Sequence, residues 1–383
     1  MKKSLLLLSA MLSCSLAFAQ GAEVEENAQT LLFIPRFEVS GFPAGQRSLY
    51  QGDKFDFSGS SLYTYFEGGI GNSDFSYAVQ GHWIAGSISD TKGLYTNVFR
   101  SQESSFIDMA YFTYAPGNFE ISLGKLCSAI GTYEEDEFDF NSYYQLSSTL
   151  WKNFQLYQYG LGVGYNLPDG TNITAQMTTS PFGNRPFTGT ANAPALFAWG
   201  LKTTGEYGFW SPIWSYNLMQ TYEWDDEGNE AGRGRMIHAL AFGNKFTFGD
   251  FDIIVDYTPR WYSGSSVFNS EGTVTASVAY NLNDKFNFIV KSGFEYNNCG
   301  EDVFGYIDEE SNPYASFIPS SLASVKETGV RGFGFGGARV EWFPLRDSQD
   351  LKVYAMAAAN NWAKTTSISL GISYNFDLGR YIK

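Results

Sequence analysis

The chain has 383 residues, of which 17% are charged, 44% are hydrophobic and 17% are aromatic, and its formal net charge is −15. Soluble domains contain about 25% charged residues. The lower charged fraction of this chain is atypical of a soluble domain, as are its 40 glycines, 33 phenylalanines and 25 tyrosines. The acidic balance argues against nucleic acid as a partner and against adhesion to anionic lipid. Three cysteines are too few for a disulfide scaffold.

Residues 1–19 have the pattern of a cleaved export signal. Two lysines precede an apolar run, and Ala17-Phe18-Ala19 has the small-x-small pattern of a cleavage site. A lipidated N-terminus at Cys14 is a weaker alternative because the three residues before it form a poor lipobox. We therefore expect export from the cytoplasm, followed by a short periplasmic segment, 20–30.

Turn signals divide the rest of the chain into strands. Beyond the signal, no apolar stretch approaches the roughly 18 residues that a membrane helix needs, so a membrane crossing would have to be made by strands. Seven short connections alternate with eight longer ones, which predicts about sixteen antiparallel strands with both termini on the periplasmic side. The short connections are Gly71–Asp74, Pro116–Asn118, Pro168–Gly170, Gly208–Pro212, Gly249-Asp250, Asn283-Asp284 and Pro344–Gln349.

Apolar and polar residues alternate within the predicted strands, at 31–39, 251–261 and 286–296 for example. The polar face is rich in Ser, Thr, Asn, Gln and Gly, whereas the outward face of a soluble β-sandwich would be charged. Aromatic residues gather near the predicted strand ends, as in the two girdles of a membrane barrel, although aromatic residues also favour strands in general. The fold class predicted is an all-β transmembrane barrel filling residues 31–377, with 378–383 as a tail.

The end of the chain strengthens this prediction. In Leu370–Phe376, apolar or aromatic residues alternate with small or polar ones, as in a strand that faces lipid. Together with the export signal and the alternation of short turns and long loops, this ending resembles that of a Gram-negative outer-membrane porin. The motif Gly371-x-x-Tyr374-x-Phe376 resembles the signal read by the barrel-assembly machinery, although this chain continues for seven residues beyond it.

The resemblance implies passive diffusion of small hydrophilic solutes, outer-membrane lipid around the barrel, a possible homotrimer, and a third external loop that folds into the lumen. Sixteen strands enclose enough space for an aqueous channel. The third long connection, about Lys125 to Thr149, carries Glu134, Glu135, Asp136, Glu137 and Asp139. If it folds inward, these carboxylates would face strand-borne cations and create a transverse field; the cations are Arg36, Lys202, Arg260, Lys291 and Arg339. Otherwise the loop is simply solvated outside.

Five acidic strand residues complete the set expected to line the pore: Glu38, Asp108, Asp256, Glu295 and Glu341. Cation preference is expected because carboxylates outnumber bases. Neither acidic loop, at 134–139 or 225–230, has the ligand spacing of a helix-loop-helix calcium site. The glycine-rich run Gly332–Gly337 is better explained by close packing in a barrel strand than by a nucleotide loop.

We expect no catalytic residue, cofactor or metal. His82 and His238, the only two histidines, have no catalytic motif around them. Cys127 and Cys299 fall at long-loop ends and could form a disulfide bond after export. The leading hypothesis is a cation-preferring porin. The alternatives are a non-conducting adhesive barrel that binds partners through loops such as 298–329, and a transporter of hydrophobic substrates, against which the short segment 20–30 argues.

Overall fold

The computed structural model describes residues 29–43, 55–57, 59–82, 107–136, 146–148, 150–151, 156–182, 195–224, 230–264, 267–268, 270–297, 332–361 and 365–380. The predicted export signal lies outside these residues. Within them, no helix is long and apolar enough to cross a membrane.

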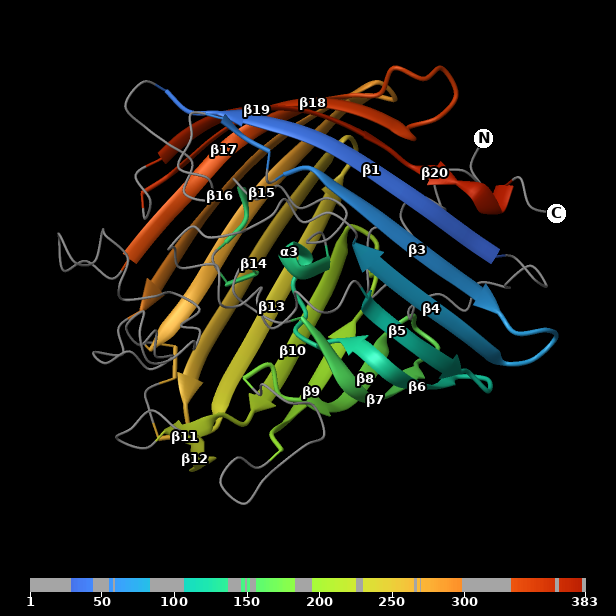
Figure 1. Ribbon diagram of the computed structural model, residues 1–383, viewed down its shortest axis with the longest axis vertical. Coiled ribbons are helices and arrows are strands. Elements are labelled where there is room, and N and C mark those ends of the chain that lie inside the picture. Colours follow the sequence, from blue (N-terminus) through green and yellow to red (C-terminus); the bar gives the residue numbers. More distant parts are fainter. Residues whose placement is uncertain are drawn as a thin grey trace.

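Sixteen long strands of the described chain form one closed antiparallel barrel (Figure 1). The first strand, β1 (Gln29–Gly41), pairs with the last long strand, β19 (Thr365–Tyr374), and this pairing closes the ring. The predicted all-β barrel is confirmed, and β1 begins two residues before the predicted first strand. The others are β3 (Ser61–Gly69), β4 (Phe75–His82), β5 (Ile107–Tyr114), β6 (Phe119–Cys127), β7 (Tyr157–Asn166), β8 (Asn172–Thr179), β9 (Phe197–Thr204), β10 (Trp210–Met219), β13 (Ile237–Phe248), β14 (Phe251–Tyr262), β15 (Glu271–Asn283), β16 (Phe286–Asn297), β17 (Gly332–Trp342) and β18 (Leu351–Asn360).

Short elements extend this framework. The strands β2 (Phe55–Asp56) and β20 (Phe376–Asp377) both pair with β1. The strands β11 (Tyr222–Trp224) and β12 (Glu230–Arg233) form a separate hairpin in the connection between β10 and β13. A 3-10 helix, η3 (Leu378–Arg380), follows β20.

The seven short connections lie where the sequence predicts them. Glycines with positive φ occupy five of them, at Gly71, Gly117, Gly170, Gly208 and Gly249, a conformation that other residues rarely adopt. The turn after β9 ends earlier than predicted, because β10 already begins at Trp210. At the other end of the barrel, the connection between β18 and β19 is only 361–364, which is shorter than the long loop expected there.

Side chains alternate between the two faces of the wall as predicted. In β14, Val255 points outward and is 38% exposed, whereas Asp256 and Arg260 point inward and are 3% and 1% exposed. Aromatic pairs occur on the outer face near the short turns, where Phe75 stacks on Tyr114 and Phe251 stacks on Tyr280, with ring centroids 4.6 Å apart in each pair. The outer face is therefore apolar and the inner face polar, as a barrel in lipid requires.

Two apolar clusters lie inside the ring, where the connection between β6 and β7 packs against the wall. In the larger cluster, Ile130, Leu150 and Trp151 of this connection pack with residues of several strands, including Met219 of β10 and Ile237 of β13. In the smaller one, Leu146 packs with Tyr354, Met356 and Ala358 of β18. The run Gly332–Gly337 lies in β17, as the close-packing interpretation predicts. A Cβ at Gly337 would collide with the Ala357 carbonyl oxygen and crowd Leu146.

Candidate functional site: the barrel interior

The third long connection occupies residues 128–156, slightly later than the sequence predicts, because β6 continues to Cys127. It contains the short helix α3 (Tyr133–Asp136), which Figure 1 shows within the ring of strands. Its described residues contact inward-facing side chains from β9, β10, β14, β16 and β18. A side chain of β8 contacts Cys127, the residue just before the connection. This part of the connection therefore lies against the inner wall.

Asp256 of β14 holds the beginning of α3. The backbone N–H of Tyr133 donates to Asp256 Oδ1 over 3.1 Å, and the N–H of Glu134 donates to Oδ2 over 2.8 Å. The first N–H groups of a helix have no partner within the helix. A carboxylate from a distant strand thus performs the task of an N-cap residue and fixes the position of α3.

Ion pairs join α3 to two further strands. Glu134 Oε1 lies 2.9 Å from Lys291 Nζ of β16, and Glu135 Oε2 lies 3.8 Å from Lys202 Nζ of β9. Glu134 Oε1 also accepts the N–H of Ser148 over 2.9 Å. The thiol of Cys127 donates to Glu135 Oε1 over 2.7 Å. Both glutamates are buried, so the two pairs neutralise charge inside the barrel and tie the connection to two separate parts of the wall.

Polar contacts extend this attachment along the connection. The donors and acceptors come from inward-facing positions of β8, β10 and β16. Side chains of the wall donate to backbone carbonyls: Gln176 Nε2 to Cys127, just before the connection, and Asn217 Nδ2 to Ala129. The connection donates in turn, from Tyr133 Oη to the Ser211 carbonyl. The N–H of Gly131 donates to Ser215 Oγ, and the N–H of Leu150 donates to Glu295 Oε1.

Two of the other predicted cations have partners on the wall. Arg260 Nη2 lies 3.0 Å from Glu271 Oε1 of β15 and donates to Thr273 Oγ1 over 3.0 Å. Arg339 Nε lies 3.1 Å from Glu341 Oε1 of the same strand. The expectation that every strand-borne cation faces the loop is thus too simple, because β15 and β17 supply carboxylates of their own. Sequence reasoning missed Glu271, although it lies at inward parity with Thr273.

The remaining predicted residues have different surroundings. Glu341 Oε1 lies 3.4 Å from Nζ of Lys352 on β18, a residue that the sequence analysis did not single out. Glu38 accepts the hydroxyl proton of Tyr354 over 2.6 Å, and Arg36 is buried nearby on the same strand. Asp108 is buried where the register between β4 and β5 shifts. Its neighbour Met109 lines a cavity between the third connection and the wall. Asp136 ends α3, while Glu137 and Asp139 lie outside the described residues.

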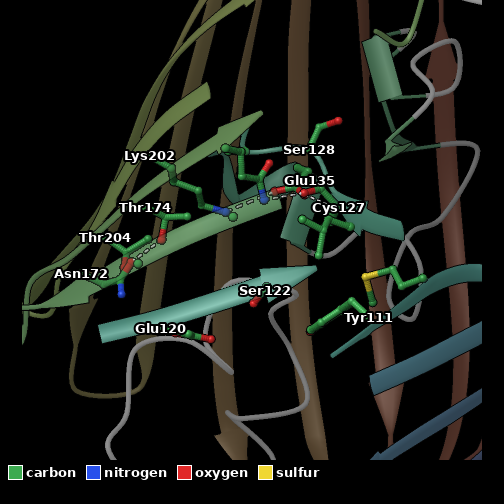
Figure 2. A pocket seen from close by; sticks show the side chains of 16 residues that line it. Tyr111, Glu120, Ser122, Cys127, Ser128, Glu135, Asn172, Thr174, Lys202 and Thr204 are labelled. Carbon is green, nitrogen blue, oxygen red and sulfur yellow. Dashed lines mark hydrogen bonds and ion pairs between the residues drawn. The ribbon is translucent and has the colours of Figure 1, made fainter. Parts of the chain in front are cut away.

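A cavity separates the third connection from the wall formed by β6–β9 (Figure 2). The cavity offers about 40 Å³ to the centres of water-sized molecules, and the space not filled by atoms is about 630 Å³ when open solvent at its mouth is included. Ser128, Ala129 and Glu135 line it on the side of the connection, and Lys202 lines it from β9. From the wall it is lined mainly by small and polar side chains, among them Glu120, Ser122, Gly162, Gly164, Asn172, Thr174, Gln176 and Thr204.

The strand register shows which residues of the cavity wall lie side by side in one row across β6–β9. Glu120 of β6 pairs with Gly164 of β7, Gly164 with Thr174 of β8, and Thr174 with Lys202 of β9. The inward face of β7 lacks side chains at this row and the next, where Gly162 pairs with Ser122. Sequence reasoning did not single out Glu120. Its position between the outward-facing Phe119 and Ile121 was the available signal.

The histidine, cysteine and acidic-loop predictions are only partly within the described chain. His238 donates or accepts at Tyr216 Oη (2.7 Å) and Ser263 Oγ (2.8 Å), and it stacks on Trp261. Cys299 lies outside the described residues, so its disulfide bond with Cys127 stays a prediction, and most of the acidic loop 225–230 lies outside them as well. Among the described residues, no group of three or more His, Cys, Asp or Glu side chains could hold a metal ion.

Comparison with known proteins identifies the fold. No protein-family model and no curated protein matches the sequence. Solved structures match nearly the whole chain: OmpF of Salmonella typhi in complex with daunomycin (13% identity, 92% of this chain and 98% of that one, TM-score 0.58), the outer-membrane channel DcaP of Acinetobacter baumannii (14%, 94% and 100%, 0.57) and an anion-selective porin from Comamonas acidovorans (10%, 92% and 100%, 0.57). At these identities the likeness concerns the fold alone. The chain is a porin-type β-barrel of sixteen strands.

Proposed function

We propose that this protein is an outer-membrane porin, a water-filled channel through which small hydrophilic solutes and ions diffuse passively. The observation that carries the proposal is the cavity left beside the third connection. The described part of that connection is attached to β10, β14, β16 and β18, and the Glu135–Lys202 pair also joins it to β9. Space nevertheless remains between it and the rest of the wall of β6–β9. A loop that lies against the inner wall in this way narrows the passage without filling it. DcaP, a similar structure, is described as an outer-membrane channel.

The channel prefers cations in this proposal. The fold alone leaves the sign of the selectivity undetermined, since one similar structure is described as anion-selective. The interior pairs Glu134 with Lys291 and Glu135 with Lys202, so these charges compensate each other. The net charge of −15 then biases the mouths of the channel toward cations, and Glu120 adds a carboxylate to the cavity wall.

Localisation and partners belong to the same proposal. The apolar outer face, with exposed residues such as Leu123, Val290 and Leu370, suits outer-membrane lipid. The last strands, β19 and β20, carry the motif that the barrel-assembly machinery would read, and residues 1–19 would direct export and then be removed. A homotrimer is a further prediction.

Planar-bilayer recording of the purified protein in a KCl gradient tests the proposal. We expect steady ohmic conductance steps and a reversal potential that corresponds to a potassium-over-chloride permeability ratio above one. A ratio below one would contradict the cation preference and leave the channel intact. Protein that inserts without passing current would contradict the channel and favour the adhesive barrel.

A further inference from the structure

We propose that the cavity beside β6–β9 contains a binding subsite for the ammonium group of a small cationic solute, and that the carboxylate of Glu120 is its counter-charge. This inference rests on the proposed channel function and deepens it. It assigns a solute class to the channel, where the fold assigns only a passage.

Glu120 is the first reason. Its side chain lines the cavity, and the residue is only 9% exposed. Nowhere in the described parts of the chain does a hydrogen bond or ion pair join its carboxylate to another residue, and Figure 2 shows it apart from the linked pairs Lys202–Glu135 and Asn172–Thr174. A buried carboxylate without a partner is costly. A cation from the passing solute would remove that cost.

The surroundings of Glu120 supply further oxygen acceptors. A Cβ placed on Gly164 would lie 3.5 Å from Glu120 Oε2 and 3.4 Å from Thr174 Oγ1, so the carboxylate and this hydroxyl flank the same patch of bare backbone. Thr174 Oγ1 uses its proton in a hydrogen bond to Asn172 Oδ1 and can still accept one. Thr204 of β9, which pairs with Asn172 in the register, also has a buried hydroxyl oxygen without a partner. It lies three strands from Glu120, so it would contact the rest of the solute and not the same ammonium group.

This set of groups fits an ammonium group better than other ligands. An ammonium group has three N–H donors and no acceptor, and the site offers one carboxylate and the hydroxyl oxygen of Thr174. A divalent metal would need several carboxylates, and no cluster of them exists among the described residues. An anion would require a free cation. Lys202 is paired with Glu135. Its backbone also lies on β9, three strands from Glu120, which is roughly 14 Å along the wall.

The experiment measures conductance against concentration in planar bilayers, with ethanolammonium chloride as the probe. The wild-type protein should show conductance that saturates, because a bound cation must leave before the next one enters. Glu120→Gln keeps the size of the side chain and removes its charge. It should raise the half-saturating concentration about tenfold, the loss expected for one charge-assisted hydrogen bond.

Two further variants separate the subsite from general electrostatics and from misfolding. Glu206→Gln removes one carboxylate from the exposed turn between β9 and β10, outside the cavity, and should leave the half-saturating concentration unchanged. Gly164→Ala retains Glu120 and adds a methyl group in ordinary contact with its neighbours, so the barrel should form and binding should weaken less than in Glu120→Gln.

Saturation-transfer NMR with ethanolammonium on the full-length protein in micelles distinguishes failure of the subsite from failure of the channel. Conductance with an unshifted half-saturating concentration in Glu120→Gln would overturn the subsite and leave the channel. Absence of current, combined with an NMR signal that Glu120→Gln abolishes, would support the subsite and overturn the channel. Absence of both signals would overturn both.

Discussion

Glu134 of α3 and Lys291 of β16 form an ion pair of 2.9 Å inside the barrel, and their side chains are only 3% and 13% exposed. The same Glu134 oxygen accepts the N–H of Ser148, further along the third connection. The pair therefore attaches two parts of this connection, α3 and the segment around Ser148, to the single strand β16. Its position between α3 and the wall predicts that it controls how far the connection narrows the channel.

Replacing Lys291 by Met should release the third connection from β16. The change leaves the buried Glu134 carboxylate without its cation, and breaking a buried pair from one side costs about 3–5 kcal/mol. Single-channel recording should show a larger and noisier conductance. The double variant Glu134→Gln/Lys291→Met removes both charges and should be closer to the wild type than Lys291→Met alone. Unchanged conductance in Lys291→Met would contradict a role of this pair in the constriction.

Replacing Asp256 by Asn should loosen α3 without affecting the barrel. A carboxylate accepts both N–H groups of Tyr133 and Glu134, whereas an amide offers one oxygen and turns an NH₂ group toward the second donor. Limited proteolysis of residues 128–156 should become faster. Asp252→Asn is the matched control, because Asp252 lies on the same strand near the short turn and contacts Lys245 and Thr247 instead. Equal cleavage in the two variants would disprove the capping role of Asp256.

Two neighbouring glycines of β7 should respond differently to alanine. A Cβ at Gly160 would collide with the carbonyl oxygen of Met177 on the paired strand. A Cβ at Gly162 would lie 3.5 Å from Gln176 Cγ, which is an ordinary van der Waals contact. Gly160→Ala should therefore lower the yield of folded barrel on refolding, measured by the mobility difference between heated and unheated samples in gels. Gly162→Ala should refold like the wild type. The reverse order would contradict the strand packing described.

The sequence predicts the wall of the barrel better than its interior. Alternation at period two and turn glycines such as Gly170 and Gly249 are local features, so sixteen strands and seven short turns could be predicted from them. The contacts of α3 join residues far apart in sequence, as in Tyr133 with Asp256, and no local pattern pairs them. The charges of the third connection were therefore predictable, while their partners were not. Glu120 was missed because a single acidic residue in a strand carries no motif.

Hydrogen bonding beside the barrel seam should contribute to its stability. Tyr354 of β18 donates to Glu38 Oε2 of β1 over 2.6 Å, across the intervening β19, whose Ser369 hydroxyl lies 2.6 Å from Ser40 Oγ of β1. These contacts join the first strand to the last strands of the chain, where the barrel closes. Glu38 is 2% exposed, so a lost donor is not replaced by bulk water.

Tyr354→Phe removes only the hydroxyl and should lower the stability of the barrel by about 1–3 kcal/mol, the cost of a buried acceptor that loses a charge-assisted bond. The temperature at which unheated, compact protein converts to the unfolded band in gels should fall accordingly. Tyr374→Phe is the matched control, because Tyr374 ends β19 and its ring stacks with Phe376, so this contact does not depend on the hydroxyl. Equal conversion temperatures for Tyr354→Phe and wild type would show that Glu38 is satisfied by its other partners, and that the strand pairing between β1 and β19 holds the seam closed without this hydrogen bond.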